Sequence, residues 1–185
     1  MRRAVTMLLL AVALLAVAPP LAAQEEGDEA VPPATPPQPL SAQIRAAGYN
    51  VTDQEAAYLD ADAQFTDQFV APMLTVELHA PYINDDFSRQ VVLAELQQVA
   101  NLDPNGNTVQ PPPTLVDLDR IQVARRTAIR QAAQQWLAAL QANDPNWVMA
   151  GSDAYGAARQ SESDWYAALR QRLAGAPAGA PATAP

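Results

Sequence analysis

The first helix predicted from the spacing of apolar residues follows a clear start signal. Thr52 and Glu55 stand three residues apart, as in a capping box, where the two side chains satisfy free amides at a helix start. Three aromatic residues follow at helical intervals of seven and four: Tyr58, Phe65 and Phe69. We therefore expect a helix from residue 53 to about residue 71, ended by Pro72, which has no amide hydrogen to donate.

A second helix is predicted to start after Asn84, whose side chain can accept a hydrogen bond from the first turn. Asp85 and Asp86 follow, and carboxylates are stabilised at the positive end of the helix dipole. Apolar residues then recur at intervals of four and three: Val92, Leu96 and Val99. The helix is expected to end near Asn101, since residues 101–113 contain turn residues and three consecutive prolines.

The longest predicted helix runs from residue 115 to about residue 142, with Thr114 as its cap. It contains neither Gly nor Pro, and one stripe gathers larger and small apolar residues: Leu118, Ile121, Ala128, Ala132, Trp136 and Leu140. Residues 143–145, Asn-Asp-Pro, are expected to end it, with Pro145 opening a short following turn. This segment has the clearest helical periodicity in the chain.

Two further segments complete the pattern. A last helix is predicted after Ser161 or Ser163, and Gly175 ends it, because glycine suits a helix C-terminus. Residues 73–80 alternate between apolar and polar positions as a strand does, but only residues 107–109 could pair with them, so a short helix or an extended connector is expected. The fold class predicted is all-α, a small bundle of four to five helices.

The N-terminus has the pattern of a secretory signal peptide over residues 1–23. Arg2 and Arg3 precede an apolar run of about 15 residues, shorter than the roughly 20 that a spanning helix needs, and two alanines precede a polar stretch. An uncleaved membrane anchor is the alternative. We expect a periplasmic or secreted protein with no transmembrane span after signal cleavage.

Two segments of biased composition flank the predicted folded domain, residues 41–174. Residues 24–40 are acidic and then rich in proline, and residues 175–185 are rich in Ala, Pro and Gly. Neither has enough large apolar side chains to offset the entropy lost on ordering, so both are expected to be disordered.

Composition excludes several classes of chemistry. The chain has no Cys, no Lys and one His. These absences exclude a Walker A phosphate loop, a Schiff-base lysine, thiolate chemistry, disulfides and a His-x-x-x-His zinc pair. The net charge of −9 disfavours nonspecific binding to nucleic acid. We expect no cofactor and no bound metal.

His79 is the candidate for catalysis, because histidine titrates near neutral pH. Glu77 and the pair Asp85 and Asp86 lie near it in sequence and could form a general-base site or a metal site with it. The interpretation we favour is a surface histidine near a helix C-terminus, where its positive charge suits the dipole.

Two other motifs start like functional sites and then depart from them. Asp103, Asn105 and Asn107 are spaced like the opening of a calcium loop, but threonines follow where that loop needs Gly and Glu. Asp60 and Asp62 are interpreted as a solvated helix face. Ser152 lies in a turn flanked by glycines but lacks the Gly-x-Ser-x-Gly pattern of a nucleophile.

Charge is distributed unevenly along the chain. Residues 53–119 contain twelve acidic residues and one arginine, and residues 120–172 contain seven arginines and four acidic residues. Arg125, Arg126 and Arg130 lie close together on the longest predicted helix. They could form a basic patch for an anionic partner, such as an acidic protein surface, a cell-wall polymer or a lipid headgroup. The alternative, which we favour, is charge pairing within the domain.

The tryptophans are assigned by their local sequence. Trp136 and Trp165 lie on helical stripes and are predicted to be core residues, whereas Trp147, in a segment of helix-breaking residues, is predicted to be exposed and to take part in binding.

These features together predict an exported helical protein that binds rather than catalyses. The partner would be an envelope protein or a cell-wall polymer engaged through a helical surface, and self-association into a homo-oligomer is also considered. The alternatives are a small periplasmic hydrolase or metal-dependent enzyme centred on His79 and nearby carboxylates, and a purely structural spacer.

Overall fold

The computed structural model describes residues 38–175, which form six α-helices and two short 3-10 helices with no strand in that range. The expected all-α class is therefore confirmed. The helices are α2 (Leu40–Ala46), α3 (Asp53–His79), α4 (Asp86–Asn101), α5 (Val116–Gln141), α6 (Trp147–Ala150) and α7 (Ser152–Gly175), with η1 (Ala80–Tyr82) and η2 (Pro113–Leu115) between them. The predicted signal peptide, nearly all of the acidic segment and the C-terminal tail lie outside the described residues.

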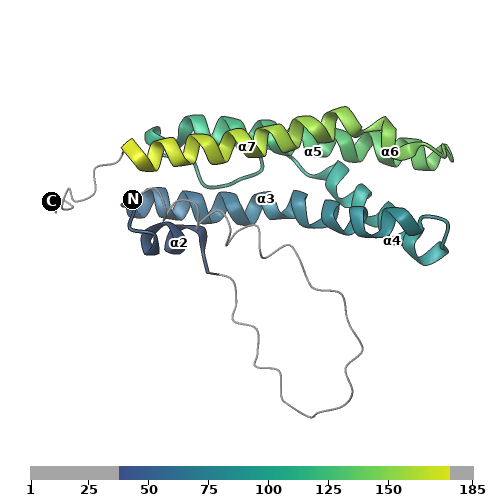
Figure 1. Ribbon diagram of the computed structural model, residues 1–185, viewed down its shortest axis with the longest axis horizontal. Coiled ribbons are helices and arrows are strands. Elements are labelled where there is room, and N and C mark those ends of the chain that lie inside the picture. The colour runs from purple at the N-terminus through teal and green to yellow at the C-terminus, as the bar shows by residue number, and fades with distance from the viewer. Residues whose placement is uncertain (1–37, 176–185) are drawn as a thin grey trace, which may run out of the picture.

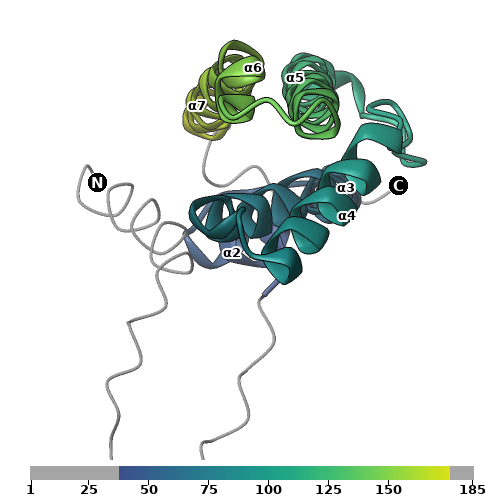
Figure 2. The same cartoon turned by 90° about the vertical axis from the view of Figure 1, so that its right-hand side faces the viewer.

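The four long helices alternate in direction and form a bundle of two layers. In Figure 1, α5 and α7 lie side by side above α3 and α4, and the end view of Figure 2 shows the same two layers. Helix α4 has 16 residues against 27 in α3, so it covers only part of α3. The short α2 packs against the other part.

The core consists of two apolar clusters, one in each half of the bundle. The larger lies where α3 turns into α4 and α5 turns into α6, and its largest members are Phe69, Met73, Leu96, Trp136, Leu140 and Trp147. The smaller lies toward the other end of the bundle, and its largest members are Ile44, Tyr58, Leu59, Trp165, Leu169 and Leu173. Trp136 and Trp165 are thus core residues, as predicted.

Helix α3 confirms one sequence prediction and contradicts another. The capping box is present: the Glu55 amide donates to Thr52 Oγ1 (3.2 Å), and the Thr52 amide donates to Glu55 Oε2 (2.9 Å). Pro72, however, does not end the helix, which continues to His79. An internal proline costs about 3 kcal/mol. Here its ring is buried, and the adjoining turns place Met73 and Val76 in the larger cluster, which offsets that cost.

The continuation of α3 also decides the conformation of residues 73–80. They form the last turns of a long helix rather than a strand, an extended connector or a separate short helix. The alternating pattern arises because Val76 is buried while Leu74 and Leu78 are exposed apolar residues.

Three predicted helix starts are wrong in position. Helix α4 is capped by Asp85, which accepts a hydrogen bond from the Ser88 amide (2.9 Å), and not by Asn84. Helix α5 begins after Leu115 with no side-chain cap, because Thr114 instead donates its hydroxyl to Glu55 Oε1 (2.6 Å).

The last helix, α7, begins at Ser152, about nine residues earlier than predicted. The Ser161 hydroxyl bonds back to the Ala157 carbonyl within the helix and caps nothing (3.0 Å). Ala154 and Ala158 are buried one turn apart, so packing against the bundle extends the helix through Gly156.

None of the helices in residues 38–175 combines the length and the apolar character required to cross a membrane.

Candidate functional site

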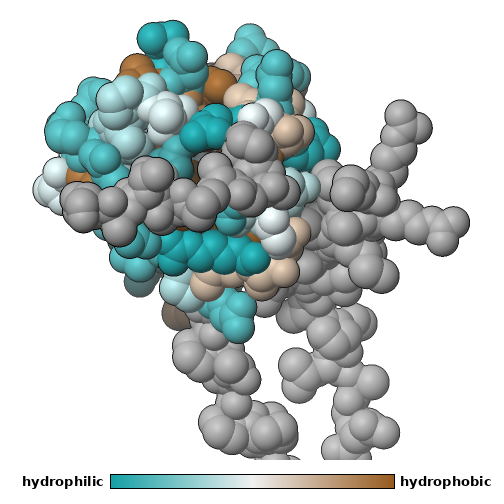
Figure 3. Space-filling model, turned by 90° about the vertical axis from the view of Figure 1, so that its left-hand side faces the viewer, coloured by the Kyte–Doolittle hydropathy of each residue, from teal (hydrophilic) through white to brown (hydrophobic). Residues whose placement is uncertain are grey.

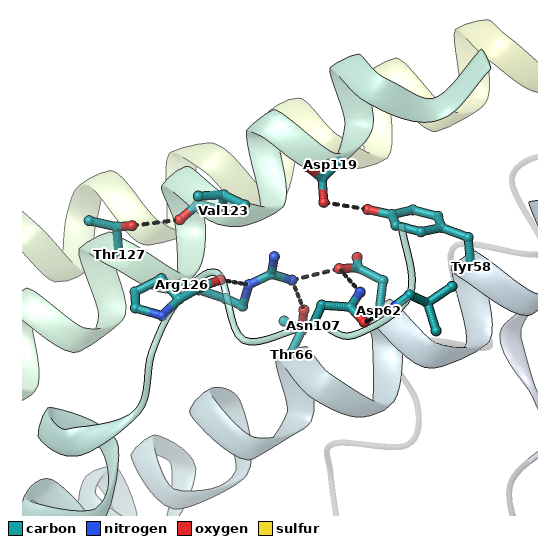
Figure 4. A network of polar contacts seen from close by, with 10 residues as sticks. Tyr58, Asp62, Thr66, Asn107, Asp119, Val123, Arg126 and Thr127 are labelled. Carbon is teal, nitrogen blue, oxygen red and sulfur yellow. Dashed lines mark hydrogen bonds and ion pairs between the residues drawn. The ribbon is translucent and has the colours of Figure 1, made fainter. Parts of the chain in front are cut away.

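Arg126, the centre of the predicted basic patch, lies inside the bundle. Its relative exposure is 0 %, and its Nη1 donates to Asp62 Oδ1 (2.6 Å) and to Thr66 Oγ1 (3.1 Å) on α3 (Figure 4). Its Nε donates to the Pro104 carbonyl (2.9 Å), and its guanidinium lies 5.0 Å from the centroid of the Phe65 ring. Arg126 therefore presents no charge to a partner.

The other two arginines of that patch also bond within the domain. Arg125 is buried and pairs with Glu162 on α7 at 2.6 Å. Arg130 is half-buried, and its Nε donates to the Ala100 carbonyl at the end of α4 (3.2 Å). Arg126 thus links α5 to α3, Arg125 links it to α7, and Arg130 links it to α4. This arrangement corresponds to the intramolecular alternative rather than to an open basic surface.

Asp62 and Arg126 belong to a buried polar layer between the two apolar clusters, which we define as Asp62, Thr66, Asn107, Gln122 and Arg126. Asn107 donates to Asp62 (3.4 Å), so the connector between α4 and α5 closes the layer. Asp62 is 1 % exposed, which contradicts its interpretation as part of a solvated face. Burial raises the pKa of Asp62, while the hydrogen bond and charge of Arg126 oppose that rise.

Two atoms of the polar layer have no hydrogen-bond partner within the described part of the chain. They are Arg126 Nη2, a donor, and Gln122 Oε1, an acceptor, and their residues lie one turn apart on α5. Asp62, Thr66, Gln122 and Arg126 are all buried and only Asn107 is half-buried, so we assign the layer a structural role.

His79 does not share a site with Glu77. Its Nδ1 lies 3.3 Å from Ser88 Oγ on α4, and its ring packs edge-on against Phe87. Glu77 points to the other side of α3, where Arg159 of α7 pairs with it at 2.8 Å. Ser88 is buried, so its hydroxyl is not placed to attack a substrate.

The calcium-like sequence is a turn. The Asn105 amide donates to Asp103 Oδ1 (3.0 Å), and Asn107 is engaged with Asp62. In residues 38–175, no group of three or more His, Cys, Asp or Glu side chains could hold a metal ion.

Trp147 is 4 % exposed, which contradicts the prediction that it is an exposed aromatic. The turn after α5 folds back, so that the Trp147 ring packs edge-on against Trp136 at 6.0 Å. The Trp136 indole nitrogen in turn donates to the Val148 carbonyl (2.7 Å). The tryptophan fixes α6 against α5 instead of contacting solvent.

This tryptophan pair forms one side of a pocket of about 320 Å³ between α3, α6 and α7. Its walls are mainly apolar and come from Val76, Trp136, Trp147, Val148 and Tyr155.

Polar groups of the pocket come from Glu77, Arg159, Ser152 and Tyr155. Glu77 and Arg159 contribute their ion pair, and the Ser152 hydroxyl is held by the Met149 carbonyl (3.0 Å). Burial, together with a hydrogen bond to Glu77, raises the pKa of Tyr155 to about 12, so its hydroxyl stays protonated at neutral pH.

Exposed apolar side chains gather at the same end of the bundle. Of the seven large apolar residues exposed in residues 38–175, six lie here, on α3, η1, the start of α4 and α6: Leu74, Leu78, Tyr82, Phe87, Val148 and Met149. We name this set the apolar end. The seventh, Val116, starts α5 at the opposite end, where hydrophilic side chains cover most of the coloured surface (Figure 3).

The apolar end adjoins the pocket through Val148. Leu74, Leu78 and Tyr82 follow at intervals of four, on one side of α3 and its continuation into η1. Phe87 lies at the start of α4 with its ring against His79, and Val148 belongs to both the apolar end and the pocket wall. Figure 2 faces this end of the molecule.

The apolar end was not predicted from the sequence. The interval of four between residues 74, 78 and 82 was a signal for it, but it is also the signal of a buried helix face. Only the positions of α2, α4 and α5, which pack on α3, show which side of α3 stays open.

Comparison of the chain with protein-family models, with curated proteins and with solved structures found no match. The function is therefore inferred from the sequence and the geometry of this chain.

Proposed function

We propose that this chain is an exported helical binding protein that engages a protein of the cell envelope through the apolar end. Export follows from the signal-peptide pattern of residues 1–23. The observation that carries the proposal is the concentration of six exposed large apolar side chains at one end of the bundle.

Such a concentration has a free-energy cost in water that a partner would remove. Leu78, Phe87 and Met149 are 73 %, 67 % and 69 % exposed. Full burial of one such side chain is worth about 1.5–3 kcal/mol. A concentration of exposed apolar side chains at one end of a domain is typical of sites where another molecule binds.

A protein partner fits this surface better than a cell-wall polymer. Sugars bind by stacking on open aromatic faces, whereas both tryptophans at this end are buried and four of the six exposed apolar side chains are not aromatic. Protein interfaces instead use a centre of aliphatic and aromatic side chains beside a pocket that accepts an anchor residue.

Crosslinked capture from the native cell envelope tests the proposal. The tagged chain is expected to retain a defined protein partner, and Leu78→Asp with Phe87→Asp should reduce its recovery at least tenfold, because both changes place charge on the apolar end. These side chains are exposed, so the fold should persist, as circular dichroism would verify.

Val116→Asp provides the matched control, since it changes an exposed apolar residue at the opposite end of the bundle. Equal recovery with the wild-type chain and the Leu78/Phe87 variant would refute the proposed binding surface.

A further inference from the structure

We infer that the partner docks a positively charged segment on the apolar end and inserts one large apolar side chain into the pocket beside Trp136 and Trp147. This inference rests on the proposed function and specifies the chemistry of the partner. It follows from the size of the pocket, from the glycine in its wall and from the charges around it.

The pocket has room for a single large side chain. Its volume of about 320 Å³ is at the lower limit of pockets that bind small molecules. Val148 is 44 % exposed and lines the pocket, so the pocket adjoins the apolar end and a chain docked there can reach it. Anchor side chains in such pockets contribute much of the energy of protein interfaces.

Gly156 keeps one wall of the pocket open. It lies in α7 and lines the pocket, and a Cβ atom placed on it would meet nothing within 4 Å. The first carbon of a side chain at this position would therefore enter open space, and a longer side chain would extend into the pocket. Gly156→Leu is a direct means of filling the pocket.

The residues around the apolar end carry negative charge. Asp85 and Asp86 precede Phe87, while Asp144 and Asp153 flank α6, and none of the four is in an ion pair of residues 38–175. Carboxylates without an ion-pair partner at the rim of an apolar surface favour a basic partner and increase its association rate.

The two arginines of this end are already engaged. Arg89 donates to the Leu140 carbonyl and to Asn143 Oδ1, both at 3.0 Å, and Arg159 pairs with Glu77. Arg159 and Glu77 cancel each other's charge, whereas Arg89 bonds only to neutral groups and offsets part of the charge of the four aspartates, which outnumber it.

The same charge argues against two other occupants. A second copy of the chain would bring like charges together in a symmetric contact, which is destabilising. An anionic lipid surface would be repelled by the same carboxylates. A basic segment of another protein is the occupant that can cover the apolar end and pair with the aspartates around it.

Two synthetic peptides of leucine alternating with charged residues test this inference, one with lysine and one with glutamate. Binding is followed by tryptophan fluorescence in a Trp165→Phe background, so that only Trp136 and Trp147 report. The lysine peptide is expected to bind saturably and at least tenfold more tightly than the glutamate peptide. Gly156→Leu should weaken its binding at least tenfold, and Asp86→Asn with Asp153→Asn should weaken it severalfold.

Several results would overturn the inference. Equal binding of the two peptides would show that charge is not recognised, and unchanged binding by Gly156→Leu would show that the pocket is not used. Self-association abolished by Leu78→Asp would assign the apolar end to a second copy.

Failure of this inference is distinguishable from failure of the proposed function. Envelope capture that depends on Leu78 and Phe87, with no binding of the lysine peptide, would refute the inference and support the proposed function. Envelope capture that does not depend on Leu78 and Phe87, together with no binding of the lysine peptide, would refute both the inference and the proposed function.

Discussion

At the scale of single residues, the Asp62–Arg126 pair shows how a charged group can be stable in the interior of a helical bundle. Moving both ions out of water is costly, and the contact at 2.6 Å offsets this only because Thr66, Asn107 and the Pro104 carbonyl satisfy other polar atoms. The pair is thus more sensitive to the loss of one partner than to the loss of both.

Arg126→Met is expected to lower the free energy of unfolding by about 3–5 kcal/mol, because it leaves Asp62 buried without its cation. The double variant Asp62→Leu with Arg126→Met should recover most of this loss, since it replaces the pair with apolar side chains of similar size. Urea unfolding followed by circular dichroism measures both. A double variant no more stable than Arg126→Met alone would contradict this account.

Arg126 also shows why sequence analysis misassigned the basic patch. Its proximity to Arg125 and Arg130 is local and visible in sequence, whereas its partner Asp62 lies 64 residues away on another helix. Trp147 was predicted wrongly for the same reason: its sequence neighbours indicate a loop, and only the fold brings it against Trp136. Burial of a single polar or aromatic residue is decided by tertiary contacts that local patterns do not contain.

At the scale of the helices, α6 and α7 meet at a glycine that has no space for a side chain. A Cβ atom on Gly151 would lie 2.6 Å from Trp136 Nε1 and 2.9 Å from the Ala132 carbonyl oxygen. Such close contacts force neighbouring atoms to move. The joint between the two helices therefore depends on glycine at this position.

Gly151→Ala is expected to destabilise the domain by about 1–3 kcal/mol through this overpacking. Gly156→Ala is the matched control, because it lies in the interior of α7 with open space around it. Alanine favours the helix there by roughly 0.5–1 kcal/mol, so this variant should unfold at a higher temperature than the wild type. Thermal unfolding would show opposite shifts for the two variants, and shifts of the same sign would contradict the prediction.

The helices themselves were more predictable than their ends. The Thr52–Glu55 capping box is a local interaction, and it placed the start of α3 correctly. Two predictions at helix ends were wrong. Pro72 does not end α3, because packing holds it within the helix, and Thr114 does not cap α5, because it bonds to Glu55, 59 residues away. Apolar periodicity identifies a helix, but tertiary contacts determine where it stops.

At the scale of the whole molecule, Glu55 links the start of α3, the short helix η2 before α5 and the last turn of α7. It completes the cap of α3, accepts a hydrogen bond from Thr114 and pairs with Arg172 of α7 at 2.6 Å. Burial alone would raise the pKa of Glu55, but the hydrogen bonds from Thr114 and Thr52 and the charge of Arg172 together lower it.

The lowered pKa predicts a loss of stability in acid. Because the folded state binds the Glu55 proton more weakly than the unfolded state, this contribution is fully present above the ordinary pKa of glutamate, about 4.3, and is lost as the pH falls through the lower folded value. Glu55→Gln should lower stability at pH 7 and make its decline in acid shallower. Urea unfolding between pH 7 and pH 3 measures this change.

Glu95→Gln is the control, since Glu95 makes no ion pair or side-chain hydrogen bond that we find in residues 38–175. A variant at Glu55 with the same acid profile as the control would show that the Glu55 contacts do not contribute.

The contact of Arg172 with Glu55 places the last turn of α7 beside the first turn of α3, so the two described ends leave the bundle on the same side (Figure 1). Tension applied between the first and last residues of the bundle would therefore separate its helices one turn after another, instead of breaking many contacts at once. The contacts nearest the ends would yield first and the apolar end last. A molecule tethered at these ends would keep its apolar end folded under a force that had already separated the helices near Glu55 and Arg172.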